Sequence, residues 1–228
     1  MNLEHVGIFF QIIVFLFAIS VHESAHAWMA NRCGDPTARL LGRITLNPLK
    51  HIDPVGTVLL PVLGILTGLP VFGWAKPTPV NPLNFHNHVR DDILTSVVGP
   101  ISNFVIASAA VALLAGIALT SSAGNQVVHN IAAGYVTATS SPLMPLTLMF
   151  YEAMLINVLL GVFNLIPIPP LDGSHVLRHF LPEPVRRVYD TAGMLGLLLL
   201  VWFGGRFIGA LVRPVVGFFD AIDRKSVV

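Results

Sequence analysis

Residues 6–30 read VGIFFQIIVFLFAISVHESAHAWMA, and Glu23 is the only formally charged residue in this stretch. A helix of this length reaches about 37 Å at 1.5 Å per residue, which exceeds the roughly 30 Å hydrocarbon core of a bilayer. The rest of the chain is similar, since 54% of its 228 residues are hydrophobic and only 11% are charged. A soluble domain has about 25% charged residues. The sequence therefore predicts an integral membrane protein whose first helix is this stretch.

Further apolar runs follow, separated by polar segments. We expect spanning helices at about 6–30, 93–119, 143–165 and 191–212, with 55–72 either re-entrant or spanning and a loop over 120–142. The proline-rich stretch GWAKPTPVNPLNFHNHVRDD, residues 73–92, predicts extended chain. The predicted fold is an all-α polytopic membrane protein. It is a helical bundle forming one membrane-embedded domain, residues 1–228, with a short extended or β segment and a re-entrant stretch near the functional site.

Positive charge clusters in residues 31–54 and 166–190, whereas the loop 120–142 has none. Cytoplasmic loops carry the excess of Lys and Arg, so both basic segments are predicted to face the cytoplasm and the loop to face outside. For 73–92 to be cytoplasmic as well, residues 55–72 would enter the membrane and return. The glycines and prolines there fit such a path, because broken backbone is tolerated at membrane depth where protein or a water-filled cavity surrounds it.

The first helix contains the pattern HExxH, formed by His22, Glu23 and His26. Positions i and i+4 lie on one face of a helix, so the two imidazoles can bind one ion, and neutral imidazole suits Zn²⁺. Glu23 lies about 100° further round, within reach of a metal-bound water. The alternative is a pair of histidines hydrogen-bonded within the bundle. A metal ion is the better compensation, because an acidic side chain alone costs roughly 2.5–3.5 kcal/mol at the centre of a membrane helix.

A catalytic zinc needs a third protein ligand and an open fourth position. Asp172 is the best candidate, in the segment NLIPIPPLDG at 164–173. This segment follows a predicted span that ends on the same side of the membrane as His26. The alternative is an ordinary carboxylate at a helix N-cap, and spacing alone leaves both open.

Three motifs together resemble the site-2 protease family of intramembrane zinc metalloproteases: the HExxH pattern, GPISN at 99–103, and Asn164 followed by PPLDG at 169–173. The resemblance covers roughly residues 8–190 and is closest to short bacterial and archaeal members. It implies one zinc per chain bound by His22, His26 and Asp172, with Glu23 as the catalytic base. Asn164 and Asn103 are candidates for holding the substrate or the oxyanion. We expect neither a PDZ domain nor a nucleotide-sensing module.

The expected function is hydrolysis of peptide bonds in transmembrane substrates, known as regulated intramembrane proteolysis, in a bacterial or archaeal cell membrane with the active site toward the cytoplasm. Residues 73–82 could offer an extended edge to an unwound substrate, with a plain proline-rich loop as the alternative. The expected partners are a transmembrane protein and membrane lipid, and a net charge of +1 gives no reason to expect nucleic acid. The alternative functions are a membrane metal transporter and a catalytically inactive membrane-binding relative. The transporter predicts several ionisable residues along a pore, and the middle spans offer only Glu152.

Overall fold

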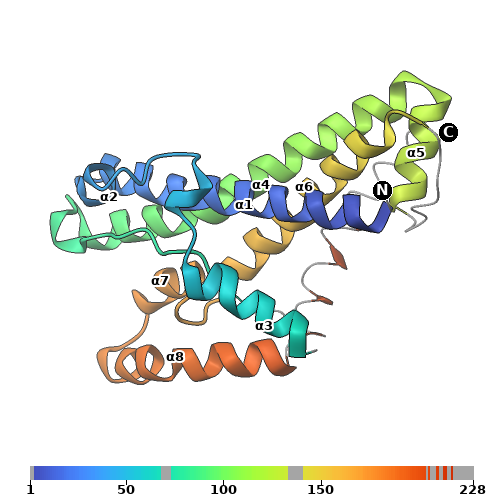
Figure 1. Ribbon diagram of the computed structural model, residues 1–228. Helices are drawn as coiled ribbons and strands as arrows, with labels where there is room; N and C mark the ends of the chain where they lie inside the picture. Colours follow the sequence, from blue (N-terminus) through green and yellow to red (C-terminus); the bar gives the residue numbers. More distant parts are fainter. Residues whose placement is uncertain are drawn as a thin grey trace. The chain divides into compact units, whose positions relative to one another are not determined.

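A computed structural model of the chain describes residues 3–67, 73–132 and 141–203, together with 205, 209–210, 213–214 and 217. Within these residues every regular element is helical and no strand forms, which confirms the predicted all-α fold. The elements, shown in Figure 1, are α1 (Leu3–Arg32), α2 (Thr37–Leu40), η1 (Pro48–Lys50), η2 (Pro54–Leu59), α3 (Leu60–Thr67), η3 (Pro82–Asn84), α4 (His88–Thr120), α5 (Ser122–Ala132), α6 (Met144–Asn164), α7 (Asp172–Arg178) and α8 (Glu183–Phe203).

Three of the described helices are long and apolar enough to cross a membrane, judged by length and composition. They are Gly7–Arg32 in α1, His88–Thr120 in α4 and Met144–Asn164 in α6. The predicted spans 6–30, 93–119 and 143–165 fall on these helices, as expected for a multi-pass membrane protein. The fourth predicted span, 191–212, falls partly on α8, which begins at Glu183. Because several residues after Phe203 lie outside the described part, this span stays a prediction.

The chain divides into two compact units, and α1, α4 and α6 each contribute to both. Unit 1 comprises Met1–Ala18, Asn103–Leu160 and Gly209–Val228, and unit 2 comprises Ile19–Ser102 and Gly161–Ile208. That the whole chain forms one domain stays a prediction.

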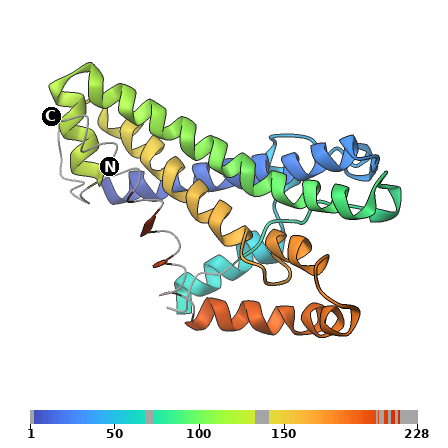
Figure 2. The ribbon, with the colours of Figure 1, turned by 180° about the vertical axis from the view of Figure 1, so that it is seen from behind.

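In unit 1 the later part of α4 packs along α6, and Figure 2 shows the two helices side by side. Ala110, Leu114 and Ala118 of α4 form a buried cluster with Met154 of α6. Small residues such as alanine let membrane helices approach closely. A buried hydrogen bond also links these two helices, in which Asn103 Nδ2 donates to Asn157 Oδ1 at 2.9 Å.

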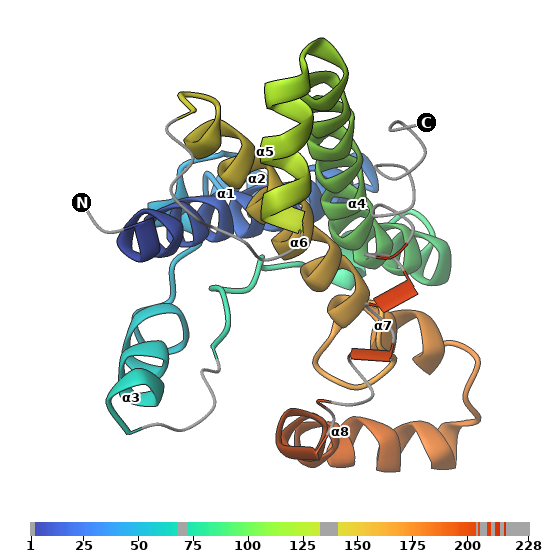
Figure 3. The same ribbon diagram turned by 90° about the vertical axis from the view of Figure 1, so that its right-hand side faces the viewer.

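The predicted loop over 120–142 is partly wrong, because residues 122–132 form α5, which folds back beside α4 in Figure 3. The helix buries an apolar stripe of Val127, Val128 and Ile131. Together with the buried Gly124 they are spaced i, i+3, i+4, i+7, which is typical of the buried face of an amphipathic helix. Helix α5 was not predicted because the interspersed Ser, Gly and Asn residues favour turns.

In unit 2 a buried aspartate ties the polar segment after α1 to the proline-rich segment. Asp35 is fully buried and accepts four hydrogen bonds, from the N–H and hydroxyl of Thr37, the N–H of Asn81 and the side-chain amide of Asn84. Nearby, Ala30, Cys33 and Phe85 form a small apolar core. These contacts hold the C-terminal end of residues 73–81 in place.

The predicted extended segment 73–92 is shorter than expected. Residues 73–81 form neither helix nor strand, but η3 follows, and α4 already begins at His88. Asn87 explains the early start, because its side chain accepts the N–H of Arg90 at 3.0 Å and so caps the helix. The stretch 55–72 contains all of η2 except Pro54 and all of α3, while residues 68–72 lie outside the described part.

Candidate metal centre

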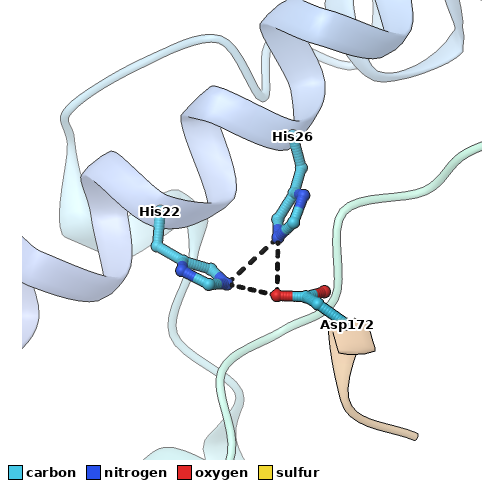
Figure 4. A group of neighbouring side chains, drawn as sticks. All are labelled: His22, His26 and Asp172. Carbon is cyan, nitrogen blue, oxygen red and sulfur yellow. Dashed lines mark hydrogen bonds and ion pairs between the residues drawn. The ribbon is translucent and has the colours of Figure 1, made fainter. Parts of the chain in front are cut away.

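His22, His26 and Asp172 come together in unit 2, and Figure 4 shows their side chains converging on one point. The Nε2 atoms of His22 and His26 are 3.0 Å apart. Asp172 Oδ2 lies 3.2 Å from the first and 3.4 Å from the second. Tetrahedral zinc with ligand bonds of 2.0–2.1 Å sets neighbouring ligand atoms about 3.3 Å apart. The three atoms therefore have the spacing that a zinc ion requires.

The hydrogen bonding at this point also favours a bound cation. His26 Nδ1 lies 2.6 Å from the carbonyl oxygen of Thr95 and must donate to it, so Nε2 of the neutral ring carries a lone pair. Asp172 Oδ2 is buried and accepts no hydrogen bond from the described residues. One proton on His22 could serve only one of these two acceptors, and a buried acceptor without a partner costs about 1–3 kcal/mol. A metal ion at the centre satisfies all three atoms together.

The Thr95 carbonyl has a further effect on His26. Metal-binding histidines usually donate their second ring N–H to a carbonyl or carboxylate, which fixes both the tautomer and the ring orientation. Thr95 lies on α4, so the α4 backbone orients a candidate ligand on α1.

Gly99 allows α4 to approach the two histidines. A methyl group built at this position would overlap Nε2 of His26 and lie 2.5 Å from its Cε1 and 2.8 Å from Cε1 of His22. Both imidazoles therefore pack directly on the α4 backbone, and any side chain at residue 99 would displace them.

Asp172 is placed by a tight turn before α7. It lies in the first turn of the helix, and Leu171 occupies the N-cap without a side-chain cap bond. The alternative that Asp172 is the N-cap carboxylate is therefore not what the structure shows. Gly173 is required at the next position, because a Cβ there would overlap the backbone carbonyl of Leu165.

The other end of α7 is held by Asp92 of α4. His179 Nε2 lies 2.7 Å from Asp92 Oδ2, and His175 Nδ1 lies 3.4 Å from Oδ1. His175 therefore contacts Asp92, which the sequence did not indicate.

The charge on Asp172 is stabilised by the same neighbours. Burial alone would raise its pKa, but the attraction of the two histidines, whose Nε2 atoms lie 3.2 and 3.4 Å from Oδ2, outweighs burial and holds the pKa of this carboxyl well below its usual range. The carboxylate is thus in the ionised form that a metal ligand requires.

Glu23 points to a different partner, Thr78 of the proline-rich segment. The N–H and the hydroxyl of Thr78 lie 2.8 and 2.7 Å from Glu23 Oε2. Thr78 was missed in the sequence, and the only available signal was its place between Pro77 and Pro79.

The two asparagine candidates differ in their surroundings. Asn103 is fully buried and bonded to Asn157, as expected for a residue that links helices. Asn164 is the last residue of α6 and is half-buried. A role for either at the substrate stays a prediction.

Comparison with known proteins also indicates a zinc metalloprotease. The model of peptidase family M50 matches residues 10–203. YwhC of Bacillus subtilis, whose name assigns it to the zinc metalloproteases, is 34% identical over 192 residues, which cover 84% of this chain and 78% of YwhC. Rip2 of Mycolicibacterium smegmatis, named in the same way, is 30% identical over 205 residues, covering 87% of this chain and 68% of Rip2. Rip2 of Mycobacterium tuberculosis is 29% identical over 204 residues, covering 88% and 69%. No solved structure matches the chain.

The family match covers most of the chain, and it confirms the resemblance to the site-2 proteases that the three motifs indicated. The cofactor of this family is zinc, in keeping with the spacing of the three converging atoms. The chain therefore belongs to peptidase family M50, the site-2 protease family, and is a membrane zinc metalloprotease.

Proposed function

We propose that the protein is an intramembrane endopeptidase that hydrolyses peptide bonds of transmembrane proteins, using a water activated by zinc and Glu23. One observation carries the proposal. The triad of His22, His26 and Asp172 includes two residues of a helix that is long and apolar enough to span a bilayer. Zinc held there would meet its substrate at membrane depth.

His22, His26 and Asp172 are the proposed ligands, leaving one position of a tetrahedral ion open. When bound, zinc lowers the pKa of a coordinated water to about 7 and polarises the scissile carbonyl. Within the described part of the chain, the bonds to the Glu23 carboxylate all reach Oε2. Oε1 is then free to take the proton of the attacking water and to deliver it to the departing amine.

A transmembrane substrate must unwind before it is cut, because a helix uses its carbonyls in i→i−4 hydrogen bonds. The segment 74–78 is the proposed docking edge for the unwound chain. Alternate residues bond inward through their N–H groups, namely Trp74 to Gly56 at 3.2 Å, Lys76 to His51 at 2.8 Å and Thr78 to Glu23 at 2.8 Å.

Ala75 lies between two of these inward-bonded residues, and its N–H and carbonyl have no hydrogen-bond partner among the described residues. In extended chain, successive residues direct their backbone groups to opposite edges. Ala75 therefore supplies one donor and one acceptor on the edge away from the protein, which supports pairing with a substrate strand. Asn164, at the end of α6, is retained as a candidate for holding the substrate or the oxyanion.

We also propose that the site opens to the cytoplasm and that residues 55–72 are re-entrant. Gly56, Pro61 and Gly64 interrupt this apolar run, and broken backbone is tolerated at membrane depth where protein or a water-filled cavity surrounds it. The basic segments 31–54 and 166–190, which follow His26 and surround Asp172 in the sequence, support the cytoplasmic orientation.

Co-expression with single-pass membrane proteins tagged at both ends tests the function. We expect a fragment cut within the transmembrane segment for some of these substrates, located by mass spectrometry, and none with Glu23→Gln. Equal cleavage by Glu23→Gln would contradict the proposal. The matched control is Glu152→Gln, which changes the same side chain in unit 1, where it accepts a 3.0 Å bond from Gln11.

A further inference from the structure

Three close polar contacts join Thr78 to Glu23. The N–H and the hydroxyl of Thr78 both reach Oε2, and the hydroxyl also lies 2.9 Å from the main-chain oxygen of Glu23. The hydroxyl proton can serve only one of these oxygens at a time, whereas the N–H is committed to the carboxylate. One carboxylate oxygen is thus held by up to two donors, and the other accepts no bond from the described residues.

The backbone around Thr78 is restrained on both sides. Pro77 and Pro79 lock their own φ near −65°, and each restricts the residue before it to extended backbone. The buried Arg43 donates to the carbonyl oxygens of the two residues that precede Thr78. The donors that face Glu23 therefore belong to backbone with little freedom to move.

An untethered glutamate samples several rotamers on a helix surface, and few of them bring a carboxylate oxygen to a given water. A general base acts only when it lies within about 2.6–3.2 Å of the atom that carries the proton. We propose that Thr78 is a positioning residue for the reaction, which holds Oε2 of Glu23 so that Oε1 is the oxygen that takes the proton. This inference rests on the proposed role of Glu23 as the base.

The arrangement also links the base to the proposed docking edge. Thr78 is the last of the three inward-bonded residues of the segment 74–78. The backbone that binds the substrate on one edge therefore orients the catalytic carboxylate on the other. Because the Thr78 side chain turns away from the substrate edge, its loss should affect the chemical step more than substrate binding.

The test compares Thr78→Val with Thr78→Ser in the purified protein, using one transmembrane substrate that the wild-type protein cleaves. Valine keeps the size and the N–H but lacks the hydroxyl, whereas serine keeps both donors. We expect Thr78→Val to lower kcat about tenfold with KM changed by less than about twofold, and Thr78→Ser to restore kcat. Thr191→Val is the control, because its hydroxyl donates to the Arg187 carbonyl oxygen within α8 and bonds to no other described residue. A full kcat in Thr78→Val, or an equal loss in Thr191→Val, would overturn the inference.

A second measurement is independent of catalysis. Thermal unfolding of the chelator-treated protein is followed for Thr78→Val, Glu23→Ala and the double variant. If the two side chains are coupled, the double variant loses less in Tm than the two single variants together. Additive shifts would show that the hydroxyl does not hold the carboxylate.

These results separate the inference from the function on which it rests. Activity that survives Glu23→Gln would contradict the proposed function. An inactive Glu23→Gln beside a fully active Thr78→Val would remove only the positioning role of Thr78.

Discussion

Replacing Gly99 by alanine should displace the zinc ligands, although alanine is the better helix former. A Cβ at residue 99 would lie 2.5 Å from His26 Cε1 and 2.8 Å from His22 Cε1. Carbon atoms pack at about 3.5–4.0 Å, so at least one ring or the backbone of α4 must move by about 1 Å. Such overpacking costs about 1–3 kcal/mol, against a gain of about 1 kcal/mol from helix propensity.

The effect on zinc should exceed the effect on stability. Ligand distances in metal sites are held within about 0.2 Å, which is far less than the displacement that alanine forces on the rings. We expect zinc affinity, measured by competition with a fluorescent chelator, to fall by about 10–100-fold, as it does for other changes beside metal ligands.

Gly116→Ala provides a matched control. Gly116 lies on the same helix α4, and a Cβ there would meet no atom within 4 Å. This variant should keep wild-type zinc affinity and gain slightly in stability. If Gly99→Ala bound zinc as tightly as Gly116→Ala, the two histidines could not both be ligands in the geometry described.

Two further predictions concern the polar residues that hold the segments of unit 2. Asp35→Ala should lower the free energy of unfolding by more than about 3 kcal/mol, because it leaves the four donors of its buried site unpaired. Denaturant unfolding in detergent measures this loss, and a loss below about 1 kcal/mol would contradict the prediction. Burial acts to raise the pKa of Asp35, but these hydrogen bonds outweigh it and hold the pKa below 3.8. The contribution of the Asp35 carboxylate to the stability of the fold is therefore complete above pH 3.8, and it disappears as the pH falls through the lower, folded-state pKa. Burial lowers the pKa of His51 from 6.5, so the neutral ring stabilises the fold above pH 6.5, and this stability is lost as the pH falls below that value. Unfolding measured between pH 8 and pH 5 should therefore depend on pH more steeply in the wild type than in His51→Gln, and equal slopes would refute this.

The long helices and the candidate ligands could be predicted from the sequence because their signals are local. Hydropathy over some 20 residues indicates α1, α4 and α6, and the HExxH spacing places His22 and His26 on one helix face. Asp172 was suggested by topology and named by its motif. Its exact surroundings, including Leu171 at the N-cap, required the structure.

The supporting contacts could not be predicted, because they join residues far apart in the chain. Thr95 lies 69 residues from His26, and Thr78 lies 55 residues from Glu23. Neither threonine belongs to a periodic pattern, and each acts in part through backbone groups that every residue possesses. Helix α5 was missed for a different reason, since its apolar stripe is short and is interrupted by turn-forming residues.

The most direct measurement is the zinc content of the purified protein in detergent, compared with that of Asp172→Ala and Glu23→Gln. The geometry of the triad predicts about one zinc per chain, lost in Asp172→Ala and kept in Glu23→Gln. Retention of zinc by Asp172→Ala would contradict the assignment, because the ion would then be held without the residue that completes the site.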